Sequence, residues 1–185
     1  MEQRIIIAGS GGQGILFLGK LISRAAMLEQ KEVTWFPSYG AEMRGGTANC
    51  TVIIADSMIG SPVIRNPDTL LIMNEASYKR FHTRLLSGGL LICDASLVTL
   101  ENHRTDIRTI RIPASGIAAT LRATKSANMV MMGAFVAATR CLSIDTVLGA
   151  VNETISSCKK DLLDINKTLI MEGYTFAERQ KSNYR

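Results

Sequence analysis

A short glycine-rich segment near the start of the chain limits most strongly how the chain can fold. The segment Gly9-Ser10-Gly11-Gly12-Gln13-Gly14 has GxGxxG spacing and follows the β-branched run Arg4–Ala8. Apolar residues then recur at helical spacing, at Ile15, Leu18, Leu21, Ile22, Ala25 and Leu28. Glycines allow the tight turn by which a chain passes from a strand straight into a helix. The segment therefore predicts a strand–loop–helix unit.

The rest of the chain alternates between strand-like and helix-like segments. Further strands are expected at residues 33–36, 48–55, 69–73, 90–93 and 109–112. The apolar run at 69–73 indicates a strand buried on both faces. Helices are expected at residues 76–86, 116–122, 128–141, 144–155 and 161–171. Ser143 is expected to cap the fourth of these, and Gly173 to end the last. The order predicts an α/β fold with a Rossmann-like, mainly parallel sheet and helices on both faces.

Length and composition indicate one globular unit. The chain has 185 residues, which suits a single core. We expect one domain over residues 1–177, followed by a polar, basic and frayed tail at 178–185. Hydrophobic residues make up 46% of the chain and charged residues 20%, as in ordinary folded proteins. This balance excludes a largely disordered chain.

Charge and hydropathy argue against nucleic acid and membrane as partners. The net charge is +5, but it is scattered, whereas nucleic-acid binders concentrate their charge on one face. The longest apolar run, Met129–Ala138, is about half as long as a membrane-spanning helix. The N-terminus lacks the apolar core of a secretion signal. We therefore expect a cytoplasmic protein.

The residues that usually hold metals or perform catalysis are sparse. The four cysteines are widely spaced with no CxxC, which argues against zinc and iron–sulfur sites and predicts buried, reduced thiols. They are Cys50, Cys93, Cys141 and Cys158. His82 and His103 are expected at the surface. Neither an HExxH motif nor a GxSxG elbow occurs. The sequence predicts no catalytic residue in this chain.

The glycine-rich segment has three interpretations. It could hold the phosphates of a dinucleotide, it could only permit a tight crossing from strand to helix, or it could contact an anion or another subunit. A dinucleotide site usually adds an acidic residue at the end of the second strand. Here that strand ends in Trp35-Phe36-Pro37-Ser38-Tyr39, without an acid. The dinucleotide interpretation is therefore disfavoured, and the other two stay open.

A second unusual segment lies between the second and third expected strands. It reads Ser38-Tyr39-Gly40-Ala41-Glu42-Met43-Arg44-Gly45-Gly46-Thr47. A glycine pair beside an arginine gives an adaptable backbone with a side chain that can bind phosphate in a bidentate manner. The alternative is that Glu42 and Arg44 form a solvated pair, with a turn at Gly45-Gly46.

Together, the two segments make the sequence recognisable. "AGSGGQGILFLGKLI" and "PSYGAEMRGGTANCTV" strongly resemble the gamma-type chains of the 2-oxoacid:ferredoxin oxidoreductase family. The resemblance continues through "DTLLIMNEASYKRF", "GGLLICDAS" and "SANMVMMGAFVA", and covers about residues 4–148. The second segment is most similar to 2-oxoglutarate-type chains (2-oxoglutarate synthase), followed by the branched-chain 2-oxoacid type. Pyruvate enzymes belong to the same family.

The resemblance implies an accessory role in a multi-subunit enzyme. The complete enzymes convert a 2-oxoacid, coenzyme A and oxidised ferredoxin to an acyl-CoA, carbon dioxide and reduced ferredoxin. The expected partners are an alpha chain, a thiamine-binding beta chain and a ferredoxin-like delta chain. Thiamine diphosphate with Mg²⁺ and the iron–sulfur clusters are expected in these partners, because Gly-Asp-Gly and clustered cysteines are missing here. The isolated chain is expected to be inactive and to carry no cofactor.

The resemblance marks the two glycine-rich segments as the candidate site. Its residues are Gly9, Gly11, Gly12, Gln13, Gly14, Tyr39, Gly40, Glu42, Arg44, Gly45 and Gly46. Coenzyme A is a candidate ligand, because a polyanion suits a helix N-terminus and Arg44. A free-standing nucleotide-binding protein is the alternative from another class. The run Met129–Met132 is either a core helix or an adaptable contact surface.

Overall fold

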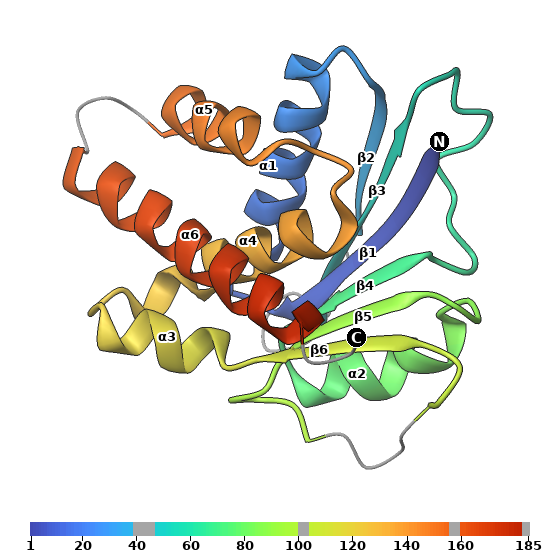
Figure 1. Ribbon diagram of the computed structural model, residues 1–185. Helices are drawn as coiled ribbons and strands as arrows, with labels where there is room; N and C mark the ends of the chain where they lie inside the picture. Colours follow the sequence, from blue (N-terminus) through green and yellow to red (C-terminus); the bar gives the residue numbers. More distant parts are fainter. Residues whose placement is uncertain (39–46, 100–103, 156–159, 183–185) are drawn as a thin grey trace.

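One six-stranded sheet organises the chain. The computed structural model describes residues 1–38, 47–99, 104–155 and 160–182. The strand order is β2-β3-β1-β4-β5-β6 (Figure 1). The strands are β1 (Glu2–Ser10), β2 (Glu32–Ser38), β3 (Thr47–Ala55), β4 (Thr69–Ile72), β5 (Leu90–Asp94) and β6 (Arg108–Ile112). Strand β3 runs antiparallel to both of its neighbours, while β1, β4, β5 and β6 are mutually parallel. The prediction of a mainly parallel sheet is confirmed.

The central strands are sandwiched between layers. Every side chain of β4 and β5 is buried, as expected for parallel strands covered on both faces. The apolar run that predicted this burial consists of Leu70, Leu71, Ile72 and Met73, none of which is measurably exposed.

The helices begin and end close to the expected places, with two exceptions. They are α1 (Ile15–Leu28), α2 (Glu75–Phe81), α3 (Ala114–Thr120), α4 (Ala127–Thr139), α5 (Ile144–Thr154) and α6 (Lys160–Ser182), with short 3-10 helices η2 (His82–Arg84) and η3 (Thr124–Ser126). The predicted cap of α5 is confirmed, because the Ser143 hydroxyl accepts a hydrogen bond from the Thr146 backbone N–H at 3.1 Å. The first exception is the helix expected at 76–86, in which α2 ends at Phe81 and η2 follows.

The second exception is α6, which continues past Gly173 to Ser182. The expected end at Gly173 is wrong because this glycine serves a helix crossing instead. A Cβ on Gly173 would collide with the carbonyl oxygen of Val130, and one on Gly133 would collide with that of Ile170. The backbones of α4 and α6 thus touch where both helices lack a side chain. Residues 178–182 of the expected tail belong to α6, and residues 183–185 lie outside the described residues.

The two faces of the sheet are covered very differently (Figure 1). Helices α1, α3, α4, α5 and α6 contribute to the larger core on one face, here called the helical face. On the other face, here called the α2 face, α2 and the loop residues Ile64 and Val98 close a smaller core. Helices therefore lie on both faces, as predicted, but in unequal numbers.

Helix α4 lies in the middle of the larger core. All residues from Ala127 to Ala138 are buried, and Met129–Met132 are at most 1% exposed. The core interpretation of the methionine run is therefore the correct one for this chain. None of the helices in the described part of the chain is long and apolar enough to cross a membrane.

Candidate functional site

The glycine-rich loop lies at the carboxyl end of β1, where it opens α1. Gly12 and Gly14 have φ angles of 91° and 72°, in the left-handed region that glycine adopts without strain. Gly9 lies in a crowded position, which is a different reason for a glycine. A Cβ there would lie 2.6 Å from Oε1 of Gln13 and 2.7 Å from Cδ1 of Ile15. The tight-crossing interpretation thus has a physical basis at three glycines.

The side chain of Gln13 fixes the loop through two hydrogen bonds. Its Oε1 accepts a hydrogen bond from the Ser10 backbone N–H at 2.6 Å, and its Nε2 donates to the carbonyl oxygen of Met73 at 2.9 Å. The side chain therefore joins the loop to the end of β4. Because Gln13 occupies the Ser10 N–H, that group is not free to bind a ligand.

Two asparagines complete the support of the loop, and sequence reasoning missed both. Asn74 Nδ2 donates to the Ser10 hydroxyl at 2.5 Å, while its Oδ1 caps α2. Asn128 is 5% exposed, and its Nδ2 donates to the carbonyl oxygen of Gly14 at 3.2 Å. Asn74 could have been found as a helix cap before Glu75. Asn128 gave only a weak signal, as an amide at the start of an apolar run.

The start of α1 has the properties of an anion site. Gly14 provides no side-chain cap, and the first turn contains no acidic residue. The free N–H groups and the positive end of the helix dipole are therefore not neutralised by a side chain of the helix itself. Such a terminus can hold a phosphate or carboxylate through backbone N–H groups.

The second glycine-rich segment is anchored beside the first. The chain leaves β2 at Ser38 and enters β3 at Thr47, and Thr47 is the register partner of Ser10. Both ends of the segment therefore lie at the carboxyl end of β1, next to the first loop. Its site candidates lie outside the described residues: Tyr39, Gly40, Glu42, Arg44, Gly45 and Gly46.

The strand order does not match a dinucleotide site. In such sites the second strand lies directly beside the first and carries the acidic residue for the ribose. Here the antiparallel β3 separates β2 from β1. The end of β2 is thus displaced by one strand, which agrees with the missing acid.

The described cysteine thiols and His82 are buried or held by their neighbours. Burial raises the pKa of the Cys50 and Cys93 thiols to about 12, so neither supplies a thiolate at neutral pH. His82 is half-buried, stacks on Tyr78 and places Nδ1 2.9 Å from the Tyr78 carbonyl oxygen. His103 lies outside the described residues. Within the described ranges, no group of three or more His, Cys, Asp or Glu could hold a metal ion.

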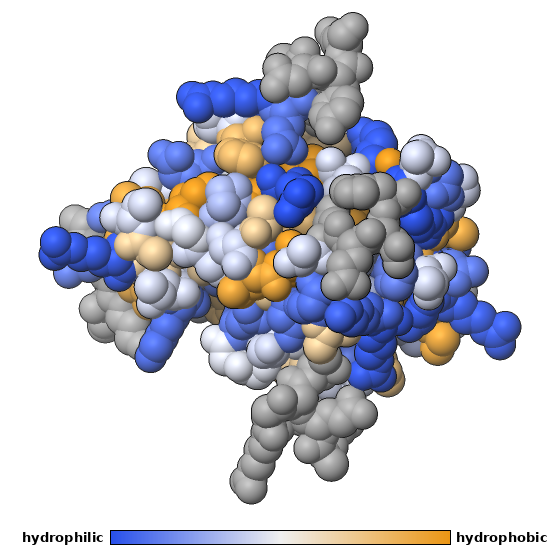
Figure 2. All heavy atoms as spheres, turned by 90° about the horizontal axis from the view of Figure 1, so that it is seen from below, coloured by the Kyte–Doolittle hydropathy of each residue, from blue (hydrophilic) through white to orange (hydrophobic). Residues whose placement is uncertain are grey.

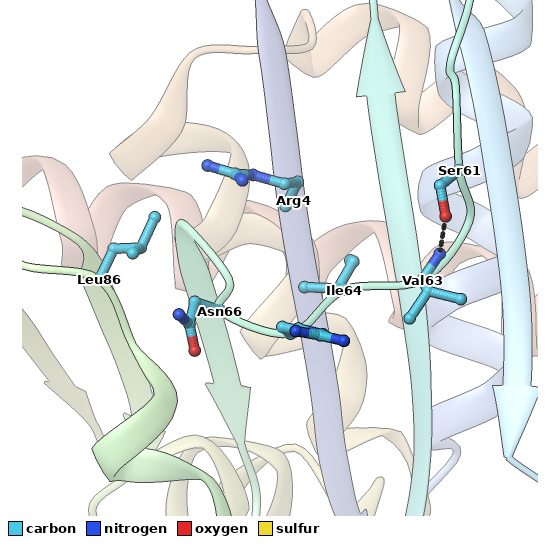
Figure 3. Close-up of a pocket in the computed structure, with 7 residues that line it drawn as sticks. Arg4, Ser61, Val63, Ile64, Asn66 and Leu86 are labelled. Carbon is cyan, nitrogen blue, oxygen red and sulfur yellow. Dashed lines mark hydrogen bonds between the residues drawn. The ribbon is translucent and has the colours of Figure 1, made fainter.

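Two surface hollows lie at the opposite end of the parallel strands. One, of about 510 Å³, is bordered by Arg4 on β1, the segment 61–66 and Leu86 (Figure 3). The other, of about 230 Å³, lies near the amino ends of β4, β5 and β6. In open α/β sheets, ligands bind at the carboxyl ends of the strands. We therefore place the candidate site at the glycine-rich loop and not at these hollows.

Comparisons with known proteins agree over nearly the whole chain. The family model described as pyruvate ferredoxin/flavodoxin oxidoreductase matches residues 4–176. 2-Oxoglutarate synthase subunit KorC of Methanocaldococcus jannaschii is 31% identical over 181 residues, covering 96% of this chain and 95% of KorC. The gamma subunit of keto/oxoacid ferredoxin oxidoreductase from Geobacter sulfurreducens has the same fold, with a TM-score of 0.82 and 27% identity. That match covers 95% of this chain and 98% of the subunit.

Other relatives are much longer. Ketoisovalerate oxidoreductase subunit VorA of Methanothermobacter marburgensis is 33% identical over 179 residues. The match covers 96% of this chain but only 37% of VorA. The chain thus spans little more than a third of the VorA relatives, whereas it matches KorC and the Geobacter subunit from end to end.

Proposed function

This chain belongs to the pyruvate ferredoxin/flavodoxin oxidoreductase family, and from that membership we propose that it is the gamma subunit of a multi-subunit 2-oxoacid:ferredoxin oxidoreductase. The observation that carries the proposal is the end-to-end match, in sequence to KorC and in fold to the Geobacter gamma subunit. Both matches cover at least 95% of the relative as well as of this chain.

The proposed complex converts a 2-oxoacid, coenzyme A and oxidised ferredoxin to an acyl-CoA, carbon dioxide and reduced ferredoxin. An alpha chain, a thiamine-binding beta chain and a ferredoxin-like delta chain are the proposed partners. Thiamine diphosphate, Mg²⁺ and the iron–sulfur clusters belong to those partners, and the isolated chain is inactive. Cys50, Cys93 and Cys141 are buried and form no disulfide, and Cys158 lies outside the described residues. Such thiols suit a reducing compartment, which supports a cytoplasmic location.

We propose 2-oxoglutarate as the oxoacid. Percentage identity does not separate the candidates, because KorC and VorA relatives are all 31–34% identical where the match is nearly full length. The proposal is supported by the resemblance of the second glycine-rich segment to 2-oxoglutarate-type chains and by the three KorC relatives among these matches. Branched-chain 2-oxoacids and pyruvate are the alternatives that a substrate assay must separate.

The glycine-rich loop and the segment 39–46 are proposed to contact coenzyme A. The supporting geometry is the uncapped start of α1 and the register of Ser10 with Thr47, which anchors both segments at one edge. A polyanion at this end of the strands would meet backbone N–H groups of α1, and we propose that Arg44 supplies a guanidinium to it.

Copurification tests the subunit role. The tagged chain is purified gently from its native cell, its partners are identified by mass spectrometry, and the complex is assayed with 2-oxoglutarate, branched-chain 2-oxoacids and pyruvate. We expect one partner with a Gly-Asp-Gly motif, another with clustered cysteines, and the highest kcat/KM with 2-oxoglutarate. Recovery of the chain alone, with tight binding of a nicotinamide or flavin nucleotide, would establish the free-standing alternative instead.

Kinetics of the assembled enzyme test the coenzyme A contact. Arg44→Ala is expected to raise the KM for coenzyme A about tenfold or more, because a bidentate phosphate contact is lost, while the KM for the oxoacid stays unchanged. Arg44→Lys should recover only part of the loss. An intact complex with an unaltered KM for coenzyme A would refute this contact, and dissociation of the complex would make Arg44 an interface residue.

A further inference from the structure

The α2 face of the sheet is only partly covered by helix. Helix α2 packs on β1 and β4, and its Tyr78 and Phe81 are buried there. Farther towards β3, the irregular segment 56–68 crosses the sheet and inserts Ile64 into the smaller core. Figure 3 shows this segment passing over β3 and β1, with Val63 and Ile64 on it. The β2–β3 part of this face therefore lacks a helical cover in the described structure.

Large apolar side chains are exposed on this part of the molecule. Met58 is 89% exposed, Val63 71% and Phe36 59%, the highest values among the described large apolar residues apart from Met1. Phe36 lies on the α2 face, because its strand neighbour Trp35 packs into the larger core on the other side. We call Phe36, Met58, Val63 and Arg65 the open patch. By contrast, the view onto the β6 edge shows mainly hydrophilic side chains with separated apolar spots (Figure 2).

A hollow adjoins the open patch. Val63 and Arg65 border the cavity of about 510 Å³, together with Ser61, Asn66 and Leu86. Figure 3 shows Val63 and Ile64 on one side of it and Leu86 on the other. The rim combines apolar side chains, such as Val63 and Leu86, with polar ones, so the hollow can accept both an apolar and a charged side chain from a partner.

The charge that is not neutralised around the hollow is positive. Arg4 is neutralised by Asp68, with hydrogen bonds of 2.8 and 2.9 Å. Arg84 donates to the carbonyl oxygens of Ile64 and Arg65 at 2.7 and 2.8 Å, so its charge is not cancelled by a carboxylate there. Among the described residues, the Arg65 guanidinium has no hydrogen-bond or ion-pair partner, and its side chain is exposed.

We propose that the open patch is the docking surface for another subunit of the complex, which presents an aliphatic side chain to the hollow and a carboxylate to Arg65. This proposal rests on the subunit role proposed above. A second copy of this chain is a poor occupant. A two-fold contact would bring the two Arg65 side chains towards each other, and the whole chain carries +5. Charge complementarity instead selects an acidic partner surface.

Variants of the assembled complex test the docking surface. Tagged partner subunits are produced together with wild-type or variant chain, and the retained chain is measured by native mass spectrometry across a salt series. Val63→Asp and Arg65→Glu are each expected to weaken retention at least tenfold. The first places a charge at an apolar position of the rim, and the second opposes the partner's carboxylate. Wild-type retention should fall with salt, and Arg65→Glu should remove most of that dependence.

Matched substitutions on α6 serve as controls. Met171→Asp alters an apolar side chain that is 41% exposed, and Arg179→Glu reverses an exposed arginine. Both should assemble like wild type. Equal retention of all four variants, or equal loss in the α6 controls, would overturn the docking surface while leaving the subunit role intact. If wild type captures no partner subunit, both proposals fail. If it instead forms dimers that Val63→Asp abolishes, the occupant is a second copy and the heterologous contact is wrong.

Discussion

The helical face and the α2 face of the sheet are stabilised in different ways. On the helical face, five helices close a continuous apolar core around α4, whose Phe135 is completely buried. On the α2 face, one short helix and two loop segments close a smaller core, and polar contacts such as those of Arg84 hold the segment 56–68 in place. Large apolar side chains are exposed on both sides, but the most exposed ones, Met58 and Val63, lie in the segment that crosses the α2 face. The difference separates a face built for stability from a face available for association.

The largest expected losses of stability come from truncating one phenylalanine on each face. Phe135→Ala should lower the free energy of unfolding by about 4 kcal/mol, because α4 is enclosed on all sides and cannot collapse around the cavity. Phe81→Ala should cost about 3 kcal/mol or less, since Phe81 lies at the end of a short helix. Urea unfolding of both variants measures the difference. A larger loss for Phe81→Ala would reverse the ranking of the two faces.

A methyl group placed between α4 and α6 should have the next largest effect. Gly133→Ala forces the two helices apart and should cost about 3 kcal/mol, visible as a lower melting temperature in calorimetry. Gly149→Ala is the matched control, because nothing lies near the position of its Cβ in α5. That change should stabilise the helix by about 0.5–1 kcal/mol. Equal melting temperatures for the two variants would show that the crossing adjusts freely.

Alkaline pH should affect the two faces alike. Burial raises the pKa of Cys50 and of Cys93 to about 12 in the folded protein, above the ordinary value of 9.0. The unfolded chain therefore loses these protons first. The free energy of unfolding is therefore unaffected by these thiols below pH 9. It falls by up to about 1.4 kcal/mol per pH unit for each thiol as the pH rises towards 12.

Urea unfolding at pH 8, 9 and 10 measures this slope. Cys50→Ala and Cys93→Ala should each make it shallower by a similar amount, because the cysteine that titrates in the unfolded chain is gone. If only Cys50→Ala changed the slope, the thiol on the α2 face would be in contact with water, and the smaller core would be open to solvent.

The smallest effect concerns polar contacts. Arg84→Ala should cost about 1 kcal/mol, because its guanidinium joins the end of the helix η2 to two carbonyl groups of the segment 56–68. Hydrogen exchange should then speed up in that segment before it does in α4. Arg24→Ala removes a half-exposed ion pair with Glu153 on the helical side and should cost about 0.5 kcal/mol or less. If hydrogen exchange in residues 61–66 were the same in Arg84→Ala as in wild type, packing alone would keep these residues ordered.

Local sequence patterns predicted most of the elements because those elements follow from local physics. Runs of β-branched residues predict the strands, the helical spacing of apolar residues predicts α1, and Ser143 predicts the start of α5. The antiparallel insertion of β3 between β1 and β2 was not predicted, because strand order depends on contacts between residues far apart in the sequence. Gly173 misled for a related reason, since a glycine can end a helix or allow another backbone to approach it.

The candidate site was predicted only in part. The glycine spacing correctly located the turn between β1 and α1, and the register of Ser10 with Thr47 explains why the second segment is anchored beside it. The inward position of Gln13 and the contribution of Asn128 could not be read from the sequence, because each depends on a contact formed by the tertiary fold. The individual roles of the eleven candidate residues remain predictions.

The hydrogen bond from Asn128 to Gly14 joins residues 114 positions apart. On the ribosome, the glycine-rich turn is synthesised long before α4. Its hydrogen bond to Asn128 can therefore form only after α4 has been synthesised. Contacts of such long sequence separation form after local ones during folding. The edge of the sheet that carries both glycine-rich segments therefore acquires its final shape only when the second half of the chain has docked. A truncated or stalled chain would display the motif without the geometry.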